Sequence, residues 1–203
     1  MNRALLKIWQ LLILLQRIHS SMEAKFDFLF EDERIFSDCR EKPPGTLDIS
    51  SLYDFTNTGF DMSEDGVTIS GYTTVIWDIQ PTDRVEVAVS VQYYDRGSWQ
   101  PTILNMVIKD FCKVMFDEKQ MWYDCYSKHI LNAAEVNRTC YNVRGSQIKF
   151  ERYTVHAVIS SGVSIKNGRH SMRFIHSAYD QNGVVRPNKI CFEIKGEFKK
   201  SSQ

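Results

Sequence analysis

Five cysteines and five histidines are the residues of this 203-residue chain that could support covalent or metal chemistry. The sequence has no Cys-x-x-Cys pair and no clustered histidines, so it lacks a metal-binding signature. It also lacks a Gly-x-Ser-x-Gly, a His-Glu-x-x-His and a phosphate-loop motif. We therefore expect a protein that is not an enzyme and that holds no cofactor and no metal. The cysteines are Cys39, Cys112, Cys125, Cys140 and Cys191.

Two histidines can be assigned to opposite faces of expected strands. His176 shares the parity of the apolar residues Met172 and Phe174, which predicts a buried, hydrogen-bonded strand residue. His156 falls on a polar parity and is expected to be solvated. Aspartate and glutamate are scattered, and no carboxylate pair can be argued from their spacing. The histidines therefore indicate structural rather than catalytic roles.

The N-terminus has the pattern of a secretory signal peptide over residues 1–20. Its first twenty residues carry three basic residues and no acid, and the apolar run 8–15 precedes the small residues Ser20 and Ser21. Eight apolar residues are too few to cross about 30 Å of hydrocarbon. The alternatives are an amphipathic N-terminal helix packed on the domain and an uncleaved anchor. We expect cleavage after Ser20, leaving residues 21–203 as one domain.

Two further features favour a secreted, extracellular protein without a transmembrane span. In an oxidising compartment cysteines pair by default, and an odd number leaves one free or paired between chains. The sequon Asn137-Arg138-Thr139 predicts glycosylation of Asn137 on a surface loop. Without residues 1–20 the chain has 25 − 3 = 22 basic and 25 acidic residues, a net charge of −3. No basic cluster remains, which argues against nucleic-acid binding.

Alternation of apolar and polar residues predicts β-strands through most of the chain. The clearest runs are 67–79 and 85–93, where one parity is almost entirely apolar. A change of parity at Glu151-Arg152 predicts a β-bulge, and Asn167-Gly168 is a strong hairpin turn signal. Further turn signals stand at Asp95-Arg96-Gly97 and Asn182-Gly183.

The pattern predicts an all-β fold, since strands do not alternate with helices. We expect an antiparallel β-sandwich or β-cup with an apolar interior, in a single domain. An eight-stranded barrel of lipocalin type is the alternative, although no Gly-x-Trp near the N-terminus supports it.

The segment Phe111–Cys140 breaks the alternation and holds three of the five cysteines. Apolar residues near helical spacing predict a partly helical, irregular loop. We expect this disulfide-stapled loop to lie across the mouth of the sandwich, because long loops in compact domains usually serve function. Its gate would consist of Met115, Phe116, Met121 and Trp122.

Ten apolar residues are candidates for contact with a ligand in the interior. For any single one of them, an ordinary place in the sandwich core is the commoner role. They are the four gate residues together with Trp77, Val91, Phe150, Val158, Met172 and Phe174.

Several segments resemble the insect chemosensory protein B (CheB) family of small secreted proteins of gustatory sensilla. That family is in turn similar to the ganglioside-activator branch of the ML lipid-recognition proteins, which are β-sandwich or β-cup domains with an apolar cavity. The resemblance implies a lipid or cuticular hydrocarbon ligand, a role in taste and contact-pheromone perception, and a sensory receptor or ion channel as a further partner. The segments are Trp77–Val89, Tyr93–Leu104, Phe111–Tyr123 and Arg186–Phe198.

The resemblance also implies a disulfide pairing. The first and last cysteines close the activator domain, which carries over onto Cys39 and Cys191, and a second bridge matches Cys112 and Cys140. Cys125 has no counterpart partner and is expected as a free thiol. The alternative to a ligand carrier is an extracellular adhesive or receptor-docking β-sandwich with a filled core and no small-molecule ligand.

Overall fold

A computed structural model describes residues 7–10 and 24–201 of the chain, and these are mostly β-strand. Residues 7–10 form an exposed helical turn. The strands are β1 (Ala24–Phe30), β2 (Phe36–Asp38), β3 (Thr46–Leu47), β4 (Tyr53–Asp54), β5 (Thr58–Ser63), β6 (Gly66–Val75), β7 (Arg84–Asp95), β8 (Ser98–Ile108), β9 (Gln147–Thr154), β10 (Ala157–Ser161), β11 (Gly168–Tyr179) and β12 (Lys189–Lys200). The helices are η1 (Ile49–Ser51), α2 (Phe111–Val114), η2 (Ser127–His129) and α3 (Ala133–Thr139).

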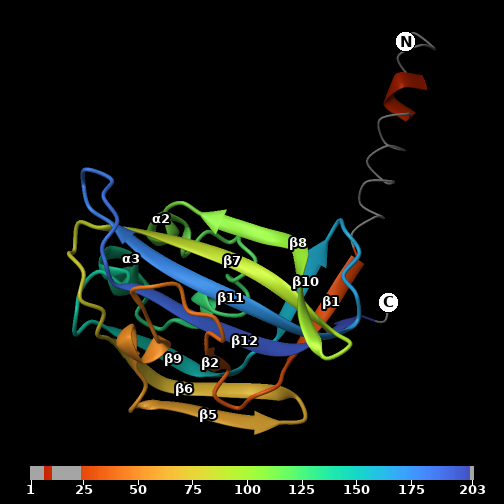
Figure 1. Ribbon diagram of the computed structural model, residues 1–203, viewed down its shortest axis with the longest axis horizontal. Coiled ribbons are helices and arrows are strands. Elements are labelled where there is room, and N and C mark those ends of the chain that lie inside the picture. The colour runs from red at the N-terminus through yellow and green to blue at the C-terminus, as the bar shows by residue number, and fades with distance from the viewer. Residues whose placement is uncertain (1–6, 11–23, 202–203) are drawn as a thin grey trace.

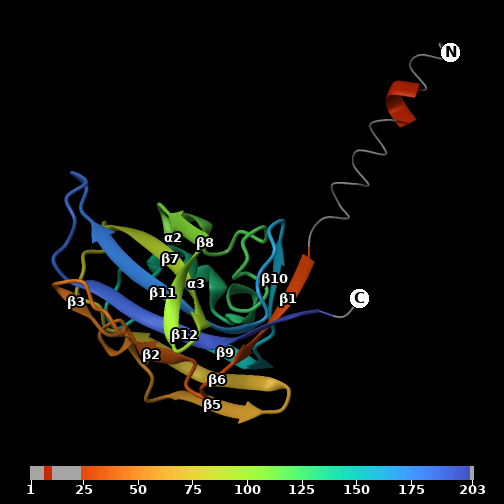
Figure 2. The ribbon, with the colours of Figure 1, turned by 45° about the vertical axis from the view of Figure 1, so that its right-hand side comes forward.

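Two sheets form the layers of the fold, which confirms the antiparallel sandwich or cup. The large sheet has the order β10-β1-β12-β11-β7-β8, and β2 and β3 also pair with β12. The small sheet has the order β4-β6-β5, with β9 paired to β6. The large sheet is curved, and β5 and β6 lie against one side of it in both ribbon views (Figures 1 and 2). Apart from β3 with β12, the pairings are antiparallel.

The space between the sheets holds the main hydrophobic core. Alternate residues of β7 and β12 point into it, and Val85 and Val87 of β7 belong to the same cluster as Val67 and Val75 of the small sheet. A smaller cluster lies toward the other end of the large sheet and consists of Phe26, Phe28, Val91, Ile165 and Phe198. Period-two alternation produces both clusters, because one face of each strand is apolar.

The predicted β-bulge is confirmed. In the pairing of β6 with β9, Ile69 faces Tyr153 and Gly71 faces Phe150, so two residues of β9 stand opposite Ser70 alone. These two residues are Glu151 and Arg152. The extra residue keeps the apolar side chains on both sides of the bulge directed inward: Ile148, Phe150, Tyr153 and Val155 are all buried.

Two turn predictions are confirmed and one is wrong. At Asn182-Gly183, between the paired strands β11 and β12, Gly183 has a positive φ angle of 79° and its N–H donates to the Asp180 carbonyl at 2.9 Å. Arg96 and Gly97 have positive φ angles of 47° and 85° and join the paired strands β7 and β8. The hairpin expected at Asn167-Gly168 does not exist, because β1 and β12 lie between β10 and β11 in the sheet. Residues 162–167 instead cross from one strand to the other, and the Asn167 side chain accepts a hydrogen bond from the Lys200 backbone N–H at 3.0 Å.

Both expected disulfides are present. Cys39 is bonded to Cys191 of β12, and Cys112 is bonded to Cys140. Cys125 forms no disulfide. The first bond fixes the chain after β2 against the outer face of the large sheet, and the second joins the two ends of the segment expected as a stapled loop.

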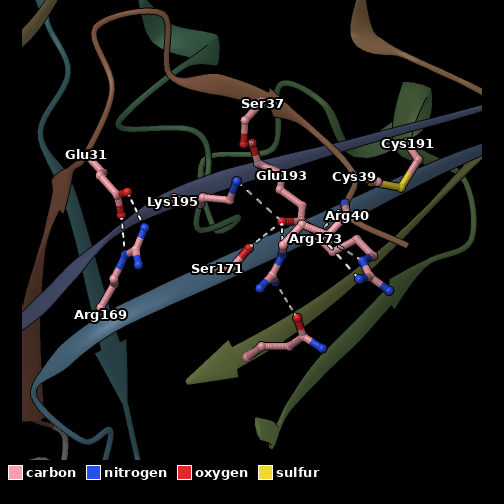
Figure 3. A network of polar contacts seen from close by, with 11 residues as sticks. Glu31, Ser37, Cys39, Arg40, Arg169, Ser171, Arg173, Cys191, Glu193 and Lys195 are labelled. Atoms are coloured by element: carbon pink, nitrogen blue, oxygen red, sulfur yellow. Dashed lines mark hydrogen bonds and ion pairs between the residues drawn. A yellow bond between two sulfur atoms is a disulfide. The ribbon is translucent and has the colours of Figure 1, made fainter. Parts of the chain in front are cut away.

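Beside the first disulfide, the carboxylate of Glu193 is buried on the outer face of β12 (Figure 3). It accepts hydrogen bonds from Arg40 Nε at 2.9 Å and from Ser171 Oγ at 3.1 Å. Arg173 Nη2 lies 3.3 Å from the same carboxylate, and Arg40 also packs over the Trp99 ring. Burial alone would raise the pKa of Glu193, but the charge and hydrogen bonds of Arg40 outweigh burial and hold that pKa below its usual range.

We expect Glu193→Gln to lower the free energy of unfolding by about 2–4 kcal/mol, because the substitution leaves Arg40 and Arg173 without their counter-charge. Urea unfolding at neutral pH with the disulfides intact measures the loss. The matched control is Glu197→Gln, an exposed position on the same strand paired only with Lys199, which should change stability by less than about 0.5 kcal/mol. Equal effects of the two substitutions would contradict a structural role for Glu193.

Candidate functional site

The segment between Phe111 and Cys140 covers one side of the interior. It connects β8 of the large sheet to β9 of the small sheet, and it contains α2, η2 and α3, which confirms a partly helical insertion. Its apolar side chains join the main core: Phe111, Met115, Ile130 and Val136 are each buried. The segment is therefore part of the wall of the sandwich.

Met115, which the sequence analysis expected as a gate residue, is an anchor of this segment. Its side chain is 1% exposed. Its backbone carbonyl accepts a hydrogen bond from Trp122 Nε1 at 3.1 Å and another from Ser127 Oγ. These bonds fold the segment around Met115. Phe116 and Trp122 pack partly buried against the core, whereas Met121 is 52% exposed.

The other candidate residues fall into three environments. Trp77 and Phe150 are buried in the main core, and Trp77 Nε1 donates to the Asn188 carbonyl at 3.1 Å. Val91 belongs to the smaller cluster. Val158 is 48% exposed on the outer face, because the inward residues of β10 are Ala157 and Ile159. The interior position predicted for Val158 is thus wrong by one residue of strand parity.

Met172 and Phe174 lie in the middle of the large sheet, where apolar side chains remain partly exposed. Phe174 pairs with Val89 of β7, and Met172 pairs with Ile194 of β12. We name Val89, Met172, Phe174 and Ile194 the central band. All four are only partly buried, although their strands belong to the two packed clusters on either side. In a sandwich with a filled core the inner faces of both sheets interdigitate, so the central band is apolar surface without full cover.

A hollow of about 380 Å³ opens at the far end of the smaller cluster. Phe26 and Ile165 of that cluster line it, together with residues 161–164, Asn167 and Lys200. The hollow is open to solvent and its lining is mainly polar, so it differs from the enclosed, mostly apolar pockets that hold small ligands. The sequence analysis did not select these residues, because the crossing loop 161–167 carries no recognisable motif.

The interior contains an unpaired histidine. His176 is 5% exposed, which confirms its predicted burial, but its Nδ1 atom has no hydrogen-bond partner in the described part of the chain. Burial lowers the pKa of His176 to about 3, so the imidazole is neutral near pH 7. His156 is exposed as predicted.

The chemistry available to the described residues is limited. Burial raises the pKa of the Cys125 thiol to about 11, which keeps it protonated and a poor nucleophile at neutral pH. Within residues 7–10 and 24–201, no group of three or more His, Cys, Asp or Glu side chains is placed to hold a metal ion. No helix in these ranges has the length and apolarity needed to cross a membrane.

Asn137 is exposed on α3, where an acceptor amide is open to solvent. The expected signal peptide and its cleavage after Ser20 fall mostly on residues 1–6 and 11–23, which lie outside the described residues.

Comparison with known proteins leaves the family open. No protein-family model and no curated protein matches the chain.

We expect Met115→Ala to lower the free energy of unfolding by about 2–5 kcal/mol, because it removes a fully buried side chain and leaves a cavity. Met121→Ala, six residues along the same segment and 52% exposed, should change stability by less than about 0.5 kcal/mol. Chemical denaturation of both variants measures the difference. Comparable losses would show that Met115 does not anchor the segment.

His176 should make the protein less stable in mild acid. Between pH 6.5 and about 3 the unfolded chain protonates this imidazole while the folded chain does not, so stability falls as the pH is lowered through this window. The slope is about 1.4 kcal/mol per pH unit, or about 2 kcal/mol from pH 6.5 to pH 5. His176→Phe, which can keep the stack on Phe192, should remove this contribution in urea titrations at pH 5–7. An unchanged slope in His176→Phe would contradict the assignment.

Proposed function

We propose that the mature chain is a secreted, non-enzymatic binding protein whose interior takes up a lipid or hydrocarbon ligand, and that it acts in chemosensory perception of taste and contact pheromones. The observation that carries this proposal is the central band. Val89, Met172, Phe174 and Ile194 give an inward apolar surface that the small sheet and the segment 111–140 leave partly uncovered. An apolar chain lying there would remove that surface from water.

The sensory setting of the proposal rests on the resemblance to the CheB family. Two of the resembling segments, 77–89 and 186–198, include large parts of β7 and β12, which carry Val89 and Ile194 of the central band. The two disulfides and the exposed sequon at Asn137 support an extracellular location, where such bonds persist.

The energetics favour an extended apolar ligand. Each CH₂ group transferred from water contributes about 0.8 kcal/mol, so a chain of about 18 carbons has roughly 14 kcal/mol before ordering and association costs are subtracted. Since apolar transfer scales with area and has no preferred direction, ligands of different chain length should bind with graded affinity.

A second candidate function is receptor docking through an exposed apolar edge. β8 ends one side of the large sheet, and its Ile103 and Val107 are 81% and 52% exposed. Both lie on β8, whose pairing with β7 is irregular between Pro101 and Asn105. An adhesive sandwich would use such an edge and would need no ligand in its interior.

Binding of a hydrophobic fluorescent probe, N-phenyl-1-naphthylamine, to the secreted protein tests the first candidate. We expect Phe174→Ala and Met172→Ala each to weaken binding about tenfold, because both remove apolar contact area inside the sandwich. Val158→Ala removes a similar apolar group from the outer face and should bind like the unmodified protein.

Native mass spectrometry of the secreted protein provides an independent reading, since a lipid carrier should retain co-purified lipid. Absence of both lipid and probe binding would contradict the proposal. If Ile103→Lys then abolished attachment to sensory cells, the docking function would be favoured.

A further inference from the structure

Four aromatic residues with polar groups come together inside the apolar interior. Tyr53 comes from β4, Tyr126 and Tyr141 come from either side of α3, and His176 comes from β11. The Tyr141 ring lies 5.5 Å from the ring of Tyr53 and 6.0 Å from that of His176. We name these four residues the tyrosine–histidine cluster.

Two atoms of the cluster are buried without a hydrogen-bond partner. Tyr53 Oη and His176 Nδ1 make no hydrogen bond of good geometry to a described residue, and their side chains are 8% and 5% exposed. The Tyr53 hydroxyl does lie near those of Tyr126 and Tyr141, which affect one another's pKa values. Native proteins rarely leave buried polar atoms unpaired, and each such atom calls for a partner from solvent or from a ligand. Both atoms belong to residues whose rings lie beside that of Tyr141.

The cluster is suited to an uncharged partner. Burial raises the pKa of both Tyr53 and Tyr141. The neighbouring tyrosines raise the pKa of Tyr53 further but act to lower that of Tyr141, and burial alone lowers the pKa of His176. No charged side chain contributes to these shifts. A carboxylate or an ammonium group placed here would be desolvated without a counter-charge, whereas a hydroxyl or carbonyl would need only hydrogen bonds.

The cluster is also continuous with the central band. The Phe192 ring stacks 5.0 Å from Phe174 of the band and 5.4 Å from His176 of the cluster. Phe174 and His176 are two residues apart on β11, so they point to the same face of the sheet. A chain lying along the band would therefore bring its end to the cluster.

We propose that the tyrosine–histidine cluster binds the uncharged oxygen of a long-chain ligand, an alcohol or a carbonyl compound, whose hydrocarbon chain lies on the central band. This inference rests on the proposed ligand-binding function. An alcohol oxygen can accept a hydrogen bond from Tyr53, or donate one to His176 Nδ1 when the imidazole proton is on Nε2. A plain alkane would leave both groups unpaired.

Displacement of N-phenyl-1-naphthylamine from the secreted protein tests the inference with four ligands of equal chain length. These are dodecane, 1-dodecanol, 2-dodecanone and dodecanoate. We expect the alcohol and the ketone to displace the probe at about tenfold lower concentration than the alkane, and dodecanoate to gain nothing over the alkane. Tyr53→Phe should abolish the preference for the alcohol while leaving displacement by dodecane unchanged.

Tyr153→Phe is the matched control, because Tyr153 is also 8% exposed but its hydroxyl already donates to the Cys125 carbonyl at 3.3 Å. This variant should retain the preference for the alcohol. Thermal unfolding establishes that each variant is folded, and Tyr141→Phe provides a second test if Tyr53→Phe is not. Equal displacement by alkane and alcohol, or tightest binding of dodecanoate, would overturn the inference while leaving lipid binding intact. Failure of every ligand to displace or bind would instead contradict the proposed function itself.

Discussion

In the middle of β12 the Glu193 carboxylate is removed from water on the outer face of the large sheet. Arg40 reaches it from the chain after β2, and Ser171 and Arg173 reach it from the neighbouring strand β11 (Figure 3). A buried carboxylate without such partners would carry a large desolvation cost. The groups that offset this desolvation cost come from the chain after β2 and from β11. The chain after β2 must therefore lie across β12 for the sheet to be stable.

The Cys39–Cys191 disulfide fixes the same contact by covalent means. Its cysteines are separated by 152 residues and stand beside Arg40 and Glu193 in the sequence. In the chain-entropy account a bridge closing so long a loop contributes about 5 kcal/mol. These contacts cover the outer face of β12. Ile190, Phe192 and Phe198 on its inner face are buried in the interior, so the strand is covered on both sides. The inner face of the large sheet therefore depends on the Cys39–Cys191 disulfide and the contacts of Glu193, which lie on its outer face.

Local sequence patterns predicted the features that depend on neighbouring residues. Alternation identified β6 and β7, and the change of parity at Glu151-Arg152 located the bulge in β9, because side-chain direction follows from strand period alone. The disulfide pairs came from the family resemblance, since spacing alone allows several pairings.

Features that depend on pairing partners were not predictable in this way. The Asn167-Gly168 signal is compatible with a hairpin, yet β10 pairs with β1, a choice made by residues over a hundred positions away. The strands β5 and β8 were missed. The edge strand β8 exposes the apolar residues Ile103 and Val107, so its sequence lacks the alternation of apolar and polar residues expected of a strand. The burial of Met115 depends on hydrogen bonds from Trp122 and Ser127 to its carbonyl, which no periodicity reports.

In the candidate site, too, packing partners decide features that the sequence pattern does not show, and these features bear on function. A list of hydrophobic residues cannot separate Phe150, which is buried in the core, from Phe174, which stays partly exposed on the central band. The difference arises from which side chains the small sheet and the segment 111–140 cover. The unpaired atoms of Tyr53 and His176 also lower the stability of the protein. A ligand that covers the band and pairs these atoms would bind only the folded chain and would stabilise it in proportion to its concentration. Incomplete packing of the interior and selectivity for a ligand would then have one structural origin.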